Sequence, residues 1–427
     1  PKPKAMAEVH VYCIKKRGTR EPDQHLARQV QHHLYLLQHV QLPARLTEFP
    51  TNELLVSNVE AIIVEPSRGA GLTNGICPPD TQLRIHVLDL HADTLPQEEV
   101  DDESQSLLYR LWQLPHQPYD GLWESLEFDG AIAYRLLDYA LTTWSLAQCG
   151  LNTTLVTNNR LLLLHGPPGT GKTTLCRALA QRLAMRQSPI VPADGPTPVS
   201  WPHTDRPVFF AEINSHSLFS KWFSESGKLV SRAFDKLREL AEVATLIILI
   251  DEVESLTSAR ANAVHGNEPS DAVRVVNAVL TELDKLRQCP SVLVLATSNL
   301  TNAIDTALLD RADVCQYIGP PTEGAIFRIL ESGVQELARI GMIKPVTIDQ
   351  DAAHLLSHSS VCAQELAASA DFATVVQRCV GLSGRALRKL PIAALALHAQ
   401  NGPLTLAQYI MALNDAADHA LHNQARS

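Results

Sequence analysis

The chain has 427 residues and a formal net charge of −10, with 45% hydrophobic and 19% charged residues. This length allows two or three domains, each with its own core, and the composition is that of an ordinary globular protein. The acidic balance argues against a protein that binds nucleic acid through its overall charge, so we expect no direct nucleic-acid binding. The longest apolar runs have the length of strands, far below the ~20 residues that span a bilayer, so we expect no membrane partner.

Residues 1–114 are predicted to form a separate N-terminal α+β domain. Residues 8–15 and 83–90 alternate between apolar and polar side chains, as half-buried strands do, and 59–64 indicates another strand. Residues 23–42 have helical spacing. No spacing typical of a catalytic site occurs in this region.

A linker is expected over residues 115–129, and a large α/β domain over 130–320. Buried strands and helices alternate in this domain, which predicts a doubly wound parallel sheet. The expected strands are 161–164, 208–213, 246–250 and 292–297, and the expected helices are 130–149, 173–185, 225–242 and 271–288. Residues 188–207 interrupt the pattern with six prolines in twenty residues, which predicts an exposed insertion.

Strand signals stop after Pro321, so residues 321–427 are predicted to form a small helical domain. Its helices are expected over 323–341, 362–380, 384–400 and 405–421.

The most specific motif follows the strand at 161–164 and has the pattern G-x-x-x-x-G-K-[ST]. The candidate nucleotide-binding residues are Gly166, Pro167, Pro168, Gly169, Thr170, Gly171, Lys172, Thr173 and Thr174. The glycines allow successive backbone amides to point at phosphate oxygens. Lys172 can bridge the terminal phosphates, and the Thr173 hydroxyl can bind Mg²⁺. Although an ordinary Gly/Pro turn is the alternative, the intact motif predicts a nucleoside triphosphate site.

A buried strand ends in two carboxylates, Asp251 and Glu252. Parallel strands deliver the residues at their carboxyl ends into a ligand crevice. There Asp251 could hold Mg²⁺ through water, and Glu252 could polarise the attacking water as a general base. The alternative is that both acids cap the following helix.

Three further residues are candidates for the same chemistry. Asn299 follows the strand at 292–297 and could orient a water against the γ-phosphate, or it could simply form a turn. Arg311 is flanked by acids and could form a surface ion pair, or it could reach a neighbouring subunit's phosphate. Arg385 opens a helix where the macrodipole disfavours a cation, which suggests an anionic partner rather than a solvated side chain.

Trp222 and Phe223 lie in a polar loop, although aromatic residues make up only 5% of the chain. Both rings could pack in the domain core. Alternatively, at least one ring is exposed in the central pore of a ring-shaped assembly and grips a peptide through apolar contact.

In this order and spacing, the motifs resemble those of the AAA+ ATPases, and within them the pachytene checkpoint protein 2 family, which remodels HORMA-domain proteins. The resemblance is strong from about residue 120 to 391. The stretches that carry it most specifically are 212–229, 251–257, 268–280, 316–321 and 381–391.

The resemblance implies an AAA+ fold with a helical lid, ATP and Mg²⁺ as cofactors, and a homo-hexameric ring. It implies that the N-terminal domain recognises a HORMA-domain protein, together with a HORMA-fold adaptor, and that the ring converts the client from its closed to its open form. The implied settings are meiotic recombination and spindle-checkpoint control, in the nucleus and cytoplasm, on chromosomes and kinetochores.

The resemblance also implies individual roles. Asn299 becomes the first sensor, Arg311 a finger acting in trans, and Arg385 the lid sensor. The implied pore residues are Lys221, Trp222 and Phe223 in the first loop and His265 and Gly266 in the second.

The sequence departs from the family pattern in two places. Many AAA ATPases carry two arginines in the finger region, whereas here Asp310 precedes Arg311. The insertion at 188–207 is longer than the family leads us to expect. Two other functions remain open: a nucleotide-gated scaffold with little hydrolysis, and a small-molecule kinase.

Overall fold

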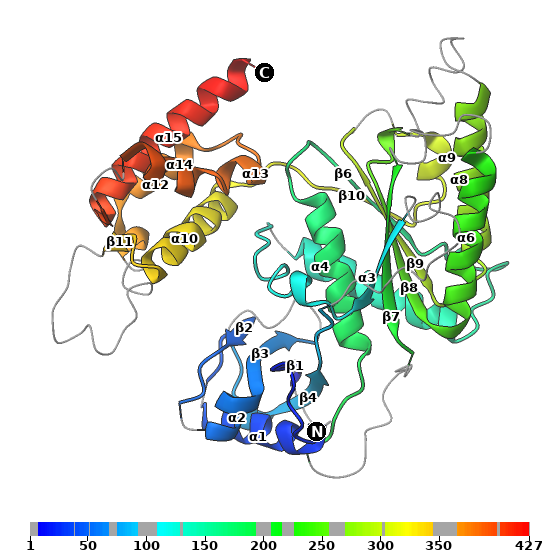
Figure 1. Ribbon diagram of the computed structural model, residues 1–427, viewed down its shortest axis with the longest axis horizontal. Helices are drawn as coiled ribbons and strands as arrows, with labels where there is room; N and C mark the ends of the chain where they lie inside the picture. Colours follow the sequence, from blue (N-terminus) through cyan, green and yellow to red (C-terminus); the bar gives the residue numbers. More distant parts are fainter. Residues whose placement is uncertain are drawn as a thin grey trace, which may run out of the picture. The chain divides into compact units, whose positions relative to one another are not determined.

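The computed structural model describes most of the chain in two compact units (Figure 1). The first unit contains residues 1–123, 131–165 and 173–316, and the second contains 124–130, 166–172 and 317–427. The described residues are 7–37, 39–50, 52–67, 75–92, 109–128, 131–193, 206–215, 226–255, 270–300, 304–344, 365–398 and 402–426. No helix in these ranges combines the length and the apolar character needed to cross a membrane.

The N-terminal part of the first unit is a four-stranded sheet with the order β2-β3-β1-β4. Its strands are β1 (Ala7–Lys15), β2 (Ala44–Leu46), β3 (Val59–Pro66) and β4 (Thr81–Leu88). The accompanying helices are α1 (Asp23–Leu36), α2 (Glu53–Asn58) and the 3-10 turn η1 (Pro78–Asp80). Strand β1 pairs antiparallel with β3 and parallel with β4, so it lies at the centre of the sheet.

The alternation along β1 explains why this sheet is buried on both faces. Val9 and Val11 pack with the apolar side of α1, whereas Tyr12 and Ile14 face the other way and pack with Met185 of a later helix. The prediction of half-buried strands therefore missed the cover on the second face.

The helical spacing predicts a helix that continues to Leu42, but α1 ends at Leu36. Val40 exchanges two backbone hydrogen bonds with Ile76, at 2.9 and 2.8 Å. The pairing draws the chain into an extended conformation, so a tertiary contact overrides the local pattern.

The second part of the first unit is a six-stranded sheet with the order β10-β6-β9-β8-β7-β5. Its strands are β5 (Tyr109–Leu114), β6 (Leu161–His165), β7 (Val208–Asn214), β8 (Thr245–Asp251), β9 (Val292–Ser298) and β10 (Val314–Tyr317). The strands β6, β9, β8 and β7 are parallel, which confirms the predicted doubly wound parallel sheet.

The helices around this sheet are η2 (Gln117–Tyr119), α3 (Ile132–Gln148), α4 (Lys172–Gln187), α6 (Ser226–Val243), α8 (Ser270–Leu286) and α9 (Thr306–Leu309). Helices α6 and α8 lie on one face of the sheet and α4 on the other (Figure 1). The β-rich core therefore has the layered arrangement that alternating strands and helices predict.

Residues 109–114 correct the predicted extent of the N-terminal domain. We had placed them in that domain, but they form β5, which pairs antiparallel with β7 of the six-stranded sheet. Trp112 stacks on Phe210 with ring centroids 5.9 Å apart. A local sequence does not show which sheet a strand joins, so it could not have placed residues 109–114 correctly.

The second unit is mainly helical, as predicted for residues 321–427. It contains α10 (Glu323–Arg339), α12 (Ala370–Arg378), α13 (Gly384–Leu387), α14 (Leu390–His398) and α15 (Leu406–Arg426). The predicted helix 384–400 is divided into α13 and α14. A short parallel pair was not predicted, formed by β11 (Ile343–Lys344) and β12 (Leu404–Thr405).

A buried charge cluster joins the two sheets of the first unit through helix α4. Glu65 of β3 is fully buried, and Arg182 and Arg186 of α4 are 2% and 6% exposed. The guanidinium nitrogens lie 3.4 and 3.7 Å from the Glu65 carboxylate oxygens. Arg186 also donates to the Pro66 carbonyl at 2.8 Å. Because buried charges are costly unless paired, this cluster fixes the end of α4 against the N-terminal sheet.

We expect Glu65→Gln to lower the free energy of unfolding by about 3 kcal/mol, because it leaves two guanidiniums buried without a counter-charge. Urea denaturation monitored by circular dichroism measures the change. Glu60→Gln is the matched control, since Glu60 lies exposed on the same strand, and we expect it to change stability by at most about 0.5 kcal/mol. Equal effects of the two substitutions would show that the cluster does not stabilise the fold.

Candidate active site

The phosphate-binding loop belongs to the second unit and follows β6 directly. Gly166, Gly169 and Gly171 have φ angles of 146, 77 and 94°, values that favour residues without a Cβ. A Cβ on Gly166 would lie only 2.1 Å from the Ile318 carbonyl oxygen. The glycines therefore permit both the backbone turn and its close contact with the neighbouring segment.

Lys172 lies inside this loop and is only 4% exposed. Its Nζ donates to the carbonyl oxygens of Gly166 and Pro167, at 2.9 and 2.7 Å. Thr170 Oγ1 donates to the same Pro167 carbonyl at 3.0 Å. The loop thus wraps around one buried ammonium, which fits a site for an anionic polyphosphate. Pro168 and Thr174 lie in the loop and in the first turn of α4, as their sequence positions require.

The start of α13 contacts this loop within the second unit. The Arg385 amide donates to the Gly169 carbonyl at 3.1 Å. Ser383 is the N-cap of α13, and its hydroxyl accepts from the Ala386 amide at 3.2 Å. The structure therefore brings the Arg385 backbone beside the loop, which is where an arginine with an anionic partner was expected.

The metal-binding candidates belong to the first unit and converge on one carboxylate oxygen. Thr173 Oγ1 donates to Asp251 Oδ1 at 2.9 Å, and Thr297 Oγ1 donates to the same oxygen. In the described part of the chain, no group of three or more His, Cys, Asp or Glu residues could hold a metal. A hydroxyl beside one carboxylate fits Mg²⁺, which takes most of its remaining ligands from phosphates and water.

The hydrogen bonds at Asp251 link three elements of the fold. Its side chain accepts hydrogen bonds from Thr173 and Thr297, which come from different elements. It therefore joins α4, β8 and β9.

Glu252 has a strained backbone, with φ 59° in the left-handed region. Its amide donates to Thr297 Oγ1 at 3.1 Å, and its carbonyl accepts from the Ser255 amide and hydroxyl. A non-glycine residue in this region costs about 1–3 kcal/mol and persists only where its surroundings hold it. The strain lies at the residue that we had selected as the general base.

The turn at Asn299 is closed by the side chain of its neighbour Ser298. The Leu300 amide donates to Ser298 Oγ at 3.2 Å, so Ser298 forms the turn. Asn299 Nδ2 instead donates to Glu254 Oε1 at 2.7 Å. Glu254 was missing from the predicted set, although it is the third acidic residue in the Asp251-Glu252-Val253-Glu254 run.

Arg311 forms a two-pronged ion pair with Asp284 of α8. The Nε–Oδ1 and Nη2–Oδ2 distances are 2.8 and 2.7 Å. These hydrogen bonds raise the pKa of the guanidinium. Asp284 lies 27 residues earlier in the chain, so no local pattern identified it.

Arg311 also lies at the amino-terminal ends of the strands, whereas Thr173 and Asp251 lie at their carboxyl-terminal ends. Its carbonyl accepts from Asn159 Nδ2 at 2.9 Å, just before β6 begins. The nucleotide loop follows the other end of this five-residue strand, which is about 16 Å long. Arg311 is therefore remote from Thr173 and Asp251 of its own chain.

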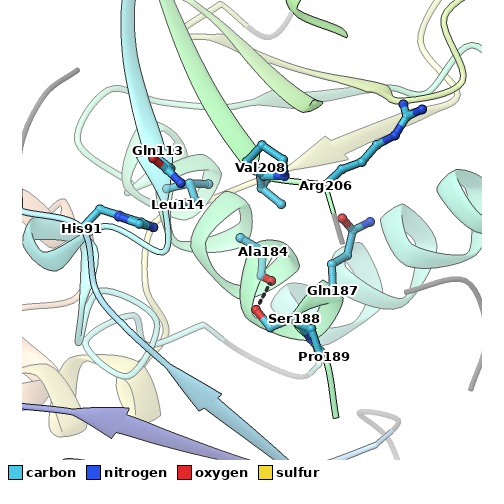
Figure 2. A pocket seen from close by; sticks show the side chains of 10 residues that line it. His91, Gln113, Leu114, Ala184, Gln187, Ser188, Pro189, Arg206 and Val208 are labelled. Carbon is cyan, nitrogen blue, oxygen red and sulfur yellow. Dashed lines mark hydrogen bonds between the residues drawn. The ribbon is translucent and has the colours of Figure 1, made fainter. Parts of the chain in front are cut away.

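The predicted pore residues Lys221, Trp222, Phe223, His265 and Gly266 lie outside the described residues, as do residues 194–205 of the proline-rich insertion. A cavity of about 310 Å³ lies beside the described ends of the insertion (Figure 2). Ala184 and Gln187 of α4 line it together with Arg206. It lies at the far end of α4 from Thr173, so it is not part of the nucleotide site.

Comparison with known proteins gives consistent results over most of the chain. Residues 162–320 match the ATPase family associated with various cellular activities (AAA), and residues 322–421 match the TRIP13-like AAA+ ATPase lid C-terminal domain. The chain is 42% identical over 385 residues to the pachytene checkpoint protein 2 homolog of Danio rerio, with 88% of this chain and 85% of that protein covered.

A second relative and a solved structure agree with this match. The chain is 42% identical over 341 residues to the pachytene checkpoint protein 2 homolog of Homo sapiens, with 78% of this chain and 75% of that protein covered. It is also similar to the structure of C. elegans PCH-2, with 31% identity and a TM-score of 0.73, over 97% of this chain and 100% of that chain.

We expect Gly166→Ala to weaken ATP binding by at least about 10-fold, or 1.4 kcal/mol, because the added Cβ would clash with the Ile318 carbonyl. Titration with a fluorescent ATP analogue measures the affinity. Gly18→Ala is the control, since Gly18 has a similarly positive φ of 85° but no atom within 4 Å of the added Cβ. An unchanged affinity of Gly166→Ala would show that the loop tolerates a side chain there.

Proposed function

Because the chain belongs to the pachytene checkpoint protein 2 family of AAA+ ATPases, we propose that it couples ATP hydrolysis to the remodelling of HORMA-domain proteins. The observation that carries the hydrolysis part of this proposal is the convergence of Thr173 and Thr297 on Asp251, beside the strained Glu252. Hydroxyls and a carboxylate that can hold Mg²⁺, next to a candidate general base, are the groups that ATP hydrolysis requires. Membership of an ATPase family also argues against a scaffold with little hydrolysis and against a small-molecule kinase.

In this proposal the loop amides and Lys172 bind the phosphates of ATP. Thr173 and Asp251 hold Mg²⁺, which when bound neutralises phosphate charge. Glu252 accepts the proton of the attacking water as general base. Asn299 orients this water. Arg385, beside the loop on α13, contacts the phosphates as the lid sensor.

We propose a homo-hexameric ring in which Arg311 completes the site of the neighbouring subunit. Its position at the other end of the strands supports this role, since it is remote from Thr173 of its own chain. Its pair with Asp284 is partly exposed, with side-chain exposures of 30 and 53%. Such a pair contributes only about 0–1 kcal/mol, so a neighbour's phosphate could replace Asp284 at small cost.

The client side of the proposal rests on the family resemblance. Lys221, Trp222 and Phe223 would grip the client in the central pore, with His265 and Gly266 in a second pore loop. The N-terminal domain would recognise the HORMA-domain client or a HORMA-fold adaptor, and pulling would convert the client from its closed to its open form. We propose action in meiotic recombination and spindle-checkpoint control, on chromosomes and kinetochores, in the nucleus and cytoplasm.

We expect Glu252→Gln to lower the steady-state ATPase rate by about 100-fold or more, since a positioned general base contributes about 10²–10⁴ in rate. ATP affinity should stay unchanged because the amide has the size of the carboxylate. Phosphate release and nucleotide titration measure the two quantities. The same variant should retain a HORMA-domain client in a pull-down with ATP.

The control is Glu242→Gln, which removes an exposed carboxylate from α6 and should keep the parental rate. If Glu252→Gln hydrolysed ATP at the parental rate, Glu252 would not be the base. If Glu252→Gln lost hydrolysis as expected but did not retain the client, the result would count against a HORMA-domain substrate.

We expect Trp222→Ala to abolish client remodelling while at least about half of the ATPase rate remains, because the indole side chain acts on the client and not on the nucleotide. Conversion of a purified HORMA-domain client from closed to open form measures remodelling, and phosphate release measures hydrolysis. Parental remodelling, or a large loss of thermal stability, would place Trp222 in the core instead of the pore.

A further inference from the structure

Glu254 and Asn299 form a hydrogen-bonded pair beside the residues already placed in the hydrolysis site. Glu254 follows the end of β8 and Asn299 the end of β9, and these strands are parallel neighbours. Asn299 Nδ2 donates to Glu254 Oε1 at 2.7 Å. The two side chains therefore meet at the carboxyl edge of the sheet, which is also the edge of Asp251 and Glu252.

The two segments that carry this pair are bonded along their length. The Glu252 amide donates to Thr297 Oγ1 at 3.1 Å, and the Val253 amide donates to the Thr297 carbonyl at 2.9 Å. The Glu254–Asn299 hydrogen bond is the next contact in this series. Glu252 and Asn299 are consequently held in one hydrogen-bonded unit.

The fold itself gives no evident need for the Glu254 carboxylate. The turn that contains Asn299 is formed by Ser298. Glu254 Oε2 is buried, and none of the described residues donates a hydrogen bond to it. Burying a carboxylate oxygen without a donor costs free energy, which is more readily explained by a role in the chemistry than by a contribution to stability.

An ionised carboxylate can only accept hydrogen bonds. Asn299 must therefore turn Nδ2 toward Glu254, and Oδ1 is left to accept from another donor. The attacking water is a donor of the right kind. Glu254→Gln would remove this constraint, because two amides can pair in either orientation.

We infer that Glu254 is a positioning residue for ATP hydrolysis, which fixes the orientation of the Asn299 amide so that Oδ1 accepts from the attacking water. This inference rests on the proposed role of Asn299. It assigns Glu254 no contact with the nucleotide. Its effect on the reaction passes through Asn299.

The test is a double-substitution cycle in the full-length chain with ATP and Mg²⁺. We expect Glu254→Gln to lower kcat by about 10-fold while KM and the affinity for ATP change by less than about 2-fold. Asn299→Ala should lower kcat at least as much. The double variant should be no slower than Asn299→Ala alone, because Glu254 has nothing left to orient.

Glu254→Ala and Glu242→Gln complete the set. Glu254→Ala removes the same carboxylate without adding an amide, and we expect the same loss of kcat and the same non-additivity. Glu242→Gln removes an exposed carboxylate and should leave kcat unchanged. Thermal unfolding midpoints and ATP affinities, measured on the same samples, separate a loss of folding from a loss of turnover.

Two outcomes overturn the inference alone: a parental kcat for both Glu254 variants, or a double variant whose loss is the product of the two single losses. A parental kcat for Asn299→Ala overturns the inference together with the proposed role of Asn299. Since Glu252→Gln tests hydrolysis separately, the wider proposal would survive any of these results.

Discussion

The hydrogen bonds that Asp251 accepts from Thr173 and Thr297 are the contacts on which the rest of the proposed hydrolysis site depends. Asp251 ends β8, Thr297 lies near the end of β9, and Thr173 stands in the first turn of α4. Only a parallel arrangement brings the carboxyl ends of neighbouring strands to the same edge. Thr297 also binds the Glu252 amide, so the same hydroxyl that orients Asp251 helps to hold the strained backbone of the next residue.

Helix α4 connects this chemistry to the N-terminal sheet. Its first turn carries Thr173, and its last turns carry Arg182 and Arg186, which are held by the buried carboxylate of Glu65. Met185 of the same turns packs under Tyr12 and Ile14 of β1. A helix fixed at one end by buried charges can transmit a displacement of its other end as a rigid element. The N-terminal sheet is therefore built onto the helix that carries Thr173, the proposed Mg²⁺ ligand.

Sequence reasoning succeeded where the chemistry is local. The loop glycines, Lys172, Thr173 and the strand ending in Asp251 and Glu252 are each recognised within a few consecutive residues, and the match to known relatives confirms the family that these motifs indicated. The parallel sheet followed from alternating periodicities. Sequence reasoning failed where a partner is distant in the chain. Residues 109–114 were placed in the N-terminal domain although they form β5 of the six-stranded sheet, and helical spacing was extended through Val40, which pairs with Ile76.

For the same reason, the sequence did not reveal two pairs of interacting side chains. Glu254 and Asn299 are separated by 45 residues, and Arg311 and Asp284 by 27. Periodicity identifies an element but not its neighbour, so these pairs become visible only when the strand order is known.

The ion pair with Asp284 bears on the proposed role of Arg311 as a finger. A finger that contributes about 10³–10⁵ in rate stabilises the transition state by about 4–7 kcal/mol. The partly exposed pair with Asp284 stabilises the resting arginine by about 0–1 kcal/mol. Exchanging Asp284 for a phosphate would therefore consume only a small part of the catalytic gain. In the proposed ring, Asp284 can hold the Arg311 guanidinium between encounters with a neighbour's phosphate without suppressing hydrolysis. In the proposed ring, the pair thus favours preorganisation of the finger over its inhibition.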